Sequence, residues 1–445
     1  MNETNPIKLT FQLLQQQYWY SMGLLFLWLF SIYSEIPLTL SSGKYIPSIT
    51  LLMLLPLVWP YIKDQFLLKH LTYILLITGI ALLSVVTHLA GNDVLSIIIR
   101  LLQFGYSIFF SVVTFLFVKC LPIKIVKDII GFFCVLIVVG CFLERIGILS
   151  SVTHAYRAVY GGTNYGGEIN AEREILIAGF SRPFFFTSEP STVGLGFFGF
   201  ASAFTFLNRK FHLDIIIFIL TIAEIMLLGS PTVLLTIVMW VVIVTVKYKI
   251  NPLKVALGVA VFCFAILTLL NTKFGDSLLG SLASRFSEEI LMEGSSMYAR
   301  IYVPYFVTFP KIISTYPFFG VGFGNNGMLN QIFGFNAAYE GTDLEFYRGA
   351  NAFVGYVSYM GIVGTVMIIA TFLWFHRTNK IPYFLVTILF WFLMCQMMGT
   401  YATPKIWCFF SLFMAASYLQ KNMALFVKNK QSRLEEMSGI SLETS

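Results

Sequence analysis

Charged side chains are scarce in this sequence of 445 residues, which holds 29 Lys and Arg and 22 Asp and Glu. Together they make up 11% of the chain, whereas a soluble protein carries about 25%. Hydrophobic residues make up 57%. So few charges cannot cover the surfaces of soluble domains of this combined length. The shortage excludes an ordinary soluble protein and indicates that lipid surrounds most of the chain.

Cysteine patterns that would indicate a disulfide framework or a zinc site are also missing. The six cysteines all lie within or at the ends of apolar stretches, and no Cys-x-x-Cys or Cys/His metal spacing occurs. No acidic cluster is spaced for a divalent metal, so we expect neither a metal nor an organic cofactor. The basic residues form no patterned stripe, which argues against nucleic acid as a partner.

Long apolar stretches are abundant instead, at about the 17–25 residues that a helix needs to cross a bilayer. The predicted spans are 18–36, 45–61, 71–90, 94–118, 129–147, 191–207, 214–229, 231–246, 254–271, 351–375, 381–398 and 405–420. Between two of them, Gly229-Ser230-Pro231 favours a tight turn. The sequence therefore predicts an all-α fold, one integral membrane domain over 1–445 with about 12 transmembrane helices.

Basic residues are shared unevenly between the two sides of these spans. The short segments on one side and both terminal segments hold more than half of the Lys and Arg, whereas the opposite short loops hold little beyond Lys44 and Lys405. Because short loops rich in Lys and Arg stay in the cytoplasm, we expect both termini there. Two long loops, 148–190 and 272–350, then lie outside the cytoplasm. The polar segment 428–445 is predicted to be a disordered cytoplasmic tail.

The second long loop has helical periodicity. Its first periodic stretch repeats an apolar residue at every fourth position, at Phe274, Leu278, Leu282, Phe286 and Ile290. Its second stretch contains Tyr298, Tyr302, Tyr305 and Phe309 and is interrupted by Pro304 and Pro310. We expect both stretches to be helices at the membrane surface or across the mouth of the bundle.

An arginine and a carboxylate stand seven residues apart at the end of the first long loop. Arg182 has a planar fork of donors that suits a phosphate, and Glu189 is a candidate proton acceptor. A structural role is the alternative. Ser188 or Ser191 would then cap the next helix, Glu189 would favour its positive end, and Arg182 would pair with a loop acid.

Other candidates lie in the second loop and within the spans. Three alternating glycines, Gly320, Gly322 and Gly324, lack the preceding strand and following Lys-Ser/Thr of a nucleotide site, but their backbone amides would suit a lipid-linked phosphate. Arg100 and Glu224 are flanked by apolar residues on both sides and are expected to face an internal cavity. Glu144 and Arg145 are interpreted as a solvated helix end.

The order of the motifs along the chain points to a known family. They are Arg182…Glu189-Pro190-Ser191, Leu228-Gly229-Ser230-Pro231-Thr232, Arg300-x-Tyr302-x-x-Pro304-Tyr305, Tyr316-Pro317-Phe318-Phe319-Gly320-Val321-Gly322-Phe323-Gly324, Ala350-Asn351-Ala352-Phe353 and Gly361-Ile362-Val363-Gly364. This order resembles the Wzy O-antigen polymerases and the related O-antigen ligases. Such ligases place a catalytic histidine just before the asparagine that opens the next span, where this chain has Ala350. The resemblance therefore favours a polymerase.

The resemblance implies a reaction at the periplasmic face of the bacterial inner membrane. An undecaprenyl-pyrophosphate-linked glycan is the donor, and a sugar hydroxyl of another lipid-linked repeat unit is the acceptor. Arg182 and Arg300 would neutralise the departing pyrophosphate in place of a metal, and Glu189 would take the acceptor proton. A chain-length-regulating membrane protein is a further expected partner. The expected substrate-binding residues are Arg100, Glu224, Tyr298, Gly320, Gly322, Gly324, Asn325, Arg348 and Asn351.

Alternatives from other functional classes remain open. An O-antigen ligase would transfer finished polymer to the lipid A core. A lipid-linked oligosaccharide flippase, or another transporter, would spread functional charges through the spans and show internal repeats, and we find no repeat. A membrane scaffold would leave the periodic second loop without a purpose.

Overall fold

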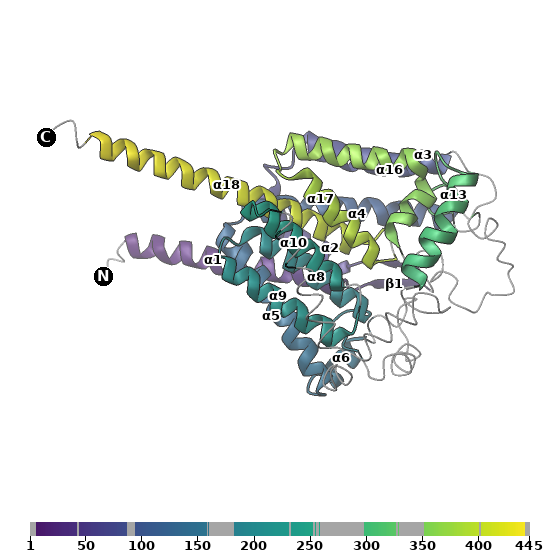
Figure 1. The fold of residues 1–445 in the computed structure, drawn as a ribbon, viewed down its shortest axis with the longest axis horizontal. Coiled ribbons are helices and arrows are strands. Elements are labelled where there is room, and N and C mark those ends of the chain that lie inside the picture. Colours follow the sequence, from purple (N-terminus) through teal and green to yellow (C-terminus); the bar gives the residue numbers. More distant parts are fainter. Residues whose placement is uncertain are drawn as a thin grey trace.

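The computed structural model describes residues 6–41, 44–86, 94–157, 159, 182–230, 233–251, 254, 258, 298–325, 328, 351–399 and 402–440. This part of the chain forms a bundle of helices with one short β-hairpin (Figure 1). The strands β1 (Leu38–Ser41) and β2 (Lys44–Ile46) pair antiparallel between the first two helices. The apolar pattern did not predict this hairpin, because strands of three and four residues are too short to show a period.

Most helices lie within a few residues of a predicted span, but the first begins at Pro6 and the last extends to Ile440, and three short helices lie in the predicted long loops. The helices are α1 (Pro6–Ser34), α2 (Ile49–Ile62), α3 (Leu68–Val86), α4 (Val94–Cys120), α5 (Ile123–Arg145), α6 (Ser150–Arg157), α8 (Pro190–Leu207), α9 (Phe211–Leu228), α10 (Leu234–Tyr248), the π-helix η3 (Tyr298–Thr308), α13 (Phe309–Thr315), α16 (Ala352–Thr378), α17 (Phe384–Met397) and α18 (Pro404–Ile440). The predicted span 254–271 and the predicted helix over Phe274–Ile290 lie outside the described residues, apart from Lys254 and Gly258.

Six helices among the described residues are long and apolar enough to cross a membrane, and α2, α10 and α17 are shorter apolar helices. The six are α3, residues 97–120 of α4, α5, α8, α9 and α16. This composition confirms a helical, multi-pass membrane protein. The count of twelve spans stays a prediction.

Both ends of the chain leave the bundle on the same side. The first turns of α1 and the last turns of α18 project from one end, here called the terminal end, while β1 and α13 lie at the other, here called the hairpin end (Figure 1). Helix α18 continues to Ile440, through most of the segment predicted to be a disordered tail. Its Lys, Gln, Arg, Leu and Glu residues have good helix propensity, which outweighs their polarity.

Helix α8 is the most enclosed helix of the bundle. All its residues except Ser191 are buried, and it contacts α5, α9, α10, α17 and α18. Its glycines allow this close packing, because a Cβ at Gly196 would overlap the Tyr33 ring and one at Gly199 would overlap the Phe409 ring. Small residues at helix contacts are typical of membrane bundles, where packing replaces the hydrophobic effect as the driving force.

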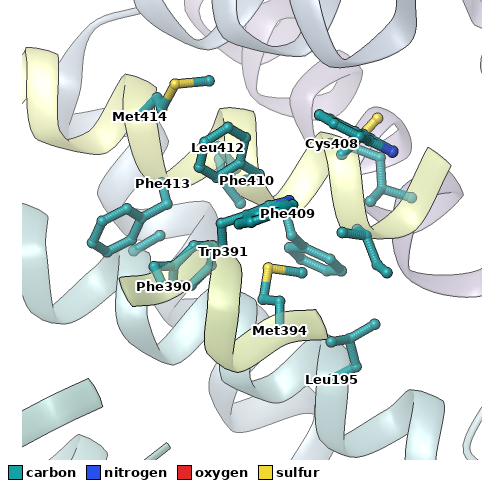
Figure 2. Close-up of a cluster of buried hydrophobic side chains, with 14 of the residues drawn as sticks. Leu195, Phe390, Trp391, Met394, Cys408, Phe409, Phe410, Leu412, Phe413 and Met414 are labelled. Carbon is teal, nitrogen blue, oxygen red and sulfur yellow. The ribbon is translucent and has the colours of Figure 1, made fainter. Parts of the chain in front are cut away.

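Aromatic side chains fill the space between α8, α17 and α18 (Figure 2). The Phe390 and Phe413 rings stack with centroids 4.3 Å apart, and Phe390 also stacks on Phe198 of α8 at 5.0 Å. Trp391 is buried beside them. Helices α8, α17 and α18 are thus held as one rigid unit, and residues at their ends keep fixed positions.

The predicted breaks and loop helices are confirmed at two places. Helix α9 ends at Leu228, and Gly229 takes a left-handed conformation with φ 54° before α10 begins. The periodic stretch from Tyr298 is helical, first as η3 and then as α13. Pro304 lies inside the π-helix, and Pro310 lies in the first turn of α13, where a missing N–H costs little.

Candidate functional site

Four charged side chains from distant parts of the sequence meet at the hairpin end. Glu35 follows α1, Glu189 precedes α8, Arg300 lies on η3 and Lys405 lies in the first turn of α18. Arg300 Nη2 is 4.0 Å from Glu189 Oε1, and Lys405 Nζ is 3.9 Å from Glu35 Oε2. These residues are called the charged cluster below. Two of its members, Glu189 and Arg300, are predicted catalytic residues.

Glu189 is held by the start of α8. It is the N-cap residue, with extended φ −157° and ψ 159°, and Pro190 follows as the first helical residue. The Ser191 hydroxyl donates to Glu189 Oε1, and the Thr192 hydroxyl donates to the Glu189 carbonyl at 2.7 Å. The alternative that Ser188 or Ser191 is the cap is therefore wrong. Glu189 combines the helix-end position with a carboxylate that is 34% exposed.

The loop before Glu189 is anchored by a second carboxylate. Glu144 accepts hydrogen bonds from Phe184 N at 3.2 Å and Phe185 N at 2.9 Å, and the Tyr33 hydroxyl donates to the Phe185 carbonyl at 2.8 Å. The interpretation of Glu144 as a solvated helix end is wrong, because the residue is only 8% exposed. Buried carboxylates need such donors. Glu144 thus fixes the loop that delivers Glu189.

Arg300 is buried and held on two sides. Its Nη1 donates to the Met397 carbonyl at 2.9 Å, at the end of α17. Its own carbonyl accepts a hydrogen bond from Asn351 Nδ2 at 3.1 Å. These contacts fix the backbone and one edge of the guanidinium, while Nη2 faces Glu189.

Asn351, predicted to bind substrate, ties three helices together. Its Oδ1 accepts from Val354 N at 3.1 Å and caps α16, while its Nδ2 also donates to Gln396 Oε1 at 2.6 Å. The Tyr305 hydroxyl donates to the same Gln396 oxygen at 2.6 Å. Burial raises the pKa of Tyr305, which keeps this phenol a neutral donor. Through this network Asn351 positions Arg300, because the amide is already engaged with η3, α16 and α17.

The glycine-rich turn docks into a break in α16. Gly320, Gly322 and Gly324 have φ of 65°, 90° and 78°, and Gly361 inside α16 has φ 68° and ψ −174°. A Cβ at Gly320 would lie 2.7 Å from the Gly361 backbone nitrogen. The positive φ values and this close approach are conditions that only glycine meets without strain.

The backbone amides of this turn are largely used within the protein. Val321 N donates to the Ser358 carbonyl at 2.8 Å and Gly322 N to the Tyr359 carbonyl at 3.1 Å. Phe323 N donates to Ser84 Oγ at 3.1 Å. Asn325, predicted to bind substrate, is 2% exposed and donates to the Val321 carbonyl at 3.0 Å. In the structure these donors hold α3, α16 and the turn together.

Arg100 and Glu224, both predicted to bind substrate, are not members of the charged cluster. Arg100 packs on the glycine-rich turn, where a Cβ at Gly324 would lie 3.1 Å from Arg100 Cδ. Glu224 is fully buried and accepts from Cys141 Sγ at 3.7 Å, and its Oε2 has no hydrogen-bond partner within the described residues. Arg145, the neighbour of Glu144, donates to the Met226 carbonyl at 2.8 Å.

Three predicted site residues are placed only in part or not at all. Arg182 is half-buried and is the first described residue of the loop that leads to Glu189. Tyr298 begins η3, and its side chain is outside the described part of the chain. Arg348 lies outside the described residues.

Sequence reasoning missed Glu35, Lys405, Gln396 and Tyr305 as members of this site. A signal existed for the first two, because opposite charges end the first predicted span and begin the last one on the same side of the membrane. Their pairing requires α1 and α18 to be neighbours, which the pattern of one segment does not reveal. Within the described residues no group of three or more His, Cys, Asp or Glu side chains is arranged to hold a metal ion.

The chain matches no protein-family model and no curated protein.

Proposed function

We propose that this protein is an O-antigen polymerase, a glycosyltransferase that joins undecaprenyl-pyrophosphate-linked repeat units at the periplasmic face of the bacterial inner membrane. The observation that carries the proposal is the contact between Arg300 and Glu189 at one end of a membrane bundle. A cation can stabilise the charge on a departing pyrophosphate and a carboxylate can accept the proton of an acceptor hydroxyl, and these two groups are in contact here.

In this reaction the acceptor hydroxyl oxygen attacks the anomeric carbon of the donor sugar. The bond between that carbon and the pyrophosphate oxygen breaks, and the pyrophosphate leaves with the electron pair. Arg300 stabilises the charge that develops on the leaving group, and Glu189 takes the proton of the attacking hydroxyl. Arg182, on the loop that precedes Glu189, supplies a second cation for the leaving group.

The geometry of the pair suits an exchangeable partner. At 4.0 Å, Arg300 Nη2 and Glu189 Oε1 are beyond the 2.7–2.9 Å typical of a charge-assisted hydrogen bond. A phosphate group offers the guanidinium a closer contact than the Glu189 carboxylate does. The 34% exposure of the Glu189 side chain also leaves it open to an acceptor hydroxyl.

The proposed orientation has twelve spans, with the hairpin end in the periplasm and both termini in the cytoplasm. Support comes from the basic residues at the terminal end, among them Lys119 at the end of α4, Lys247 at the end of α10 and Lys380 after α16. Short connections rich in lysine stay in the cytoplasm. Reporter fusions at Asn164 and Asn336 are expected to behave as external and one at Asn251 as internal.

Deletion of the gene for this protein distinguishes a polymerase from a ligase and from a flippase. Loss of a polymerase leaves single repeat units available for transfer, so lipopolysaccharide carries one unit and no ladder. A bare core with long polymer on the undecaprenyl carrier would instead indicate a ligase. Single lipid-linked units trapped on the cytoplasmic face would indicate a flippase. The residue Ala350, which replaces the ligase histidine, favours the first outcome.

A further inference from the structure

Ser191 is the one residue of α8 that is not buried, and it contacts a proposed catalytic group. Helix α8 begins at Pro190, so Ser191 lies in its first turn. The Ser191 hydroxyl donates a hydrogen bond to Oε1 of Glu189, the carboxylate oxygen that lies 4.0 Å from Arg300 Nη2. The reaction proposed above gives this hydroxyl no task.

The backbone of Glu189 is fixed by other groups. The Thr192 amide and hydroxyl donate to the Glu189 carbonyl at 3.0 Å and 2.7 Å. On the other side, Thr187 Oγ1 lies 3.0 Å from the same carbonyl and 2.8 Å from the Phe184 carbonyl, so one hydroxyl bridges Glu189 to the anchored loop. None of these contacts involves Ser191. Loss of the Ser191 hydroxyl therefore leaves the Glu189 backbone in place and frees its side chain alone.

The side chain of Glu189 has fewer restraints than its backbone. Within the described part of the chain, the side chains that contact the carboxylate are those of Ser191 and Arg300. The Arg300 contact is longer than the 2.7–2.9 Å of a charge-assisted hydrogen bond. A glutamate side chain has several rotatable bonds, and a half-buried one keeps a single orientation only where a neighbour holds it. The Ser191 hydrogen bond is the closer of the two contacts that do so.

We infer that Ser191 is a positioning residue for Glu189, an inference that rests on the proposed function. Its hydroxyl holds the carboxylate in one orientation while Arg300 engages the pyrophosphate of the substrate. Ser191 and Arg300 both approach Oε1, and they leave the Oε2 side to the acceptor hydroxyl. The proton of that hydroxyl passes to Glu189 as its oxygen attacks the anomeric carbon and the pyrophosphate leaves.

The substrate affects the two contacts of the carboxylate differently. Arg300 carries a charge for which the pyrophosphate competes with Glu189. Ser191 is neutral and follows Glu189 by two residues in the chain. It is carried by α8, whose other residues are packed against α5, α9, α10, α17 and α18. The hydroxyl donor therefore stays beside the carboxylate when the guanidinium changes partner.

The test compares purified variants with lipid-linked repeat units isolated from a strain that lacks this protein. Ser191→Ala is expected to lower kcat about tenfold, with KM within about twofold of wild type and an unchanged unfolding midpoint, because misorientation of a catalytic group affects turnover more than binding. Ser191→Thr keeps the hydroxyl and is expected to restore most of the turnover. Ser188→Ala, at a serine of the preceding loop that is also half-buried, is the matched control, with wild-type kcat expected.

A double variant shows whether Ser191 acts through Glu189. If it does, Ser191→Ala has nothing left to position in the Glu189→Gln background, and the double variant is expected to turn over within about twofold of Glu189→Gln. A serine that contacts the substrate itself would slow both backgrounds by the same factor, and that result would overturn the inference.

The remaining outcomes separate the inference from the proposed function. Wild-type kcat in Ser191→Ala beside a slow Glu189→Gln overturns the role of Ser191 and leaves the polymerase standing. A lower unfolding midpoint in Ser191→Ala with wild-type kcat per folded molecule shows a structural serine and overturns the inference as well. Wild-type protein that makes no polymer overturns the proposed function and this inference with it. A slow, well-folded Ser191→Ala that Ser191→Thr rescues supports the inference.

Discussion

Two ion pairs at opposite ends of α8 differ in geometry. Beyond the last turn of α8, Lys247 Nζ and Asp214 Oδ2 are 2.7 Å apart, with side chains 5% and 0% exposed. Before its first turn, Arg300 Nη2 and Glu189 Oε1 are 4.0 Å apart, with side chains 10% and 34% exposed. One pair is closed and dry, while the other is open on its carboxylate side.

The partners of the two pairs differ in the same way. The Asp214 carboxylate also accepts from the Tyr248 hydroxyl at 2.6 Å and from Asn208 Nδ2 at 3.0 Å, and Lys247 Nζ donates to the Thr205 carbonyl at 2.8 Å. A buried pair survives when further hydrogen bonds satisfy its remaining atoms. Asp214 and Lys247 thus join α8, α9 and α10 and leave no place for a ligand.

The comparison teaches how to separate structure from function among buried charges. At the terminal end, Asp214 and Lys247 each form hydrogen bonds with groups of neighbouring helices. At the hairpin end Arg300 has one edge fixed on Met397 and the other facing Glu189, beyond charge-assisted hydrogen-bond distance. We therefore expect variants of the first pair to change stability and variants of the second to change turnover.

The largest effect is expected from Asp214→Ala. The variant leaves Lys247 buried without its carboxylate, and breaking a buried pair costs about 3–5 kcal/mol. The thermal unfolding midpoint in detergent is expected to fall sharply, while polymerisation per folded molecule stays at the wild-type level. A variant that unfolds like wild type would show that the terminal-end pair is not structural.

Glu189→Gln is expected to have the opposite signature. The amide is nearly isosteric but cannot take a proton, so turnover should fall about 100-fold or more while the lipid-linked unit still binds. A purely capping role predicts a stability loss of about 1 kcal/mol and little else. Native mass spectrometry measures the binding and a polymerisation assay the turnover. Asp64→Asn, at an exposed turn, is the control, and normal polymer from Glu189→Gln would favour the capping role.

A smaller effect is expected at the glycine-rich turn. In Gly320→Ala the new Cβ meets backbone atoms of Ser358, Tyr359 and Gly361, and the positive φ adds strain of about 1–3 kcal/mol. We expect a lower unfolding midpoint than for Gly79→Ala, where a Cβ meets nothing within 4 Å. Equal midpoints for the two variants would mean that the turn does not hold α16.

The sequence was sufficient for features that one segment encodes alone. Apolar stretches of span length predicted the membrane helices, and Gly229 with Pro231 predicted the break after α9. The tyrosine period from Tyr298 predicted a helix inside the second loop. Each depends on local periodicity or on backbone freedom, which neighbours in the chain determine.

Contacts between distant segments were beyond such reasoning. Nothing near Gly320 indicates that its partner is the break at Gly361, and nothing near Glu35 indicates Lys405. Glu144 was misjudged for the same reason, because its donors come from the loop at Phe184 and Phe185. Arg300 and Glu189 were found as candidates from their chemistry and the resemblance, but their contact depends on how η3 packs against α16 and α17.

The most direct test of the central claim is the polymerisation rate of Arg300→Lys in liposomes that contain lipid-linked repeat units. Lysine keeps the charge but loses the planar fork, so we expect the ladder of products to form about 100-fold more slowly, with normal folded yield. Arg209→Lys, at the exposed terminal end, is the matched control and should form the ladder at the wild-type rate. An Arg300→Lys ladder that forms at the wild-type rate would contradict the account.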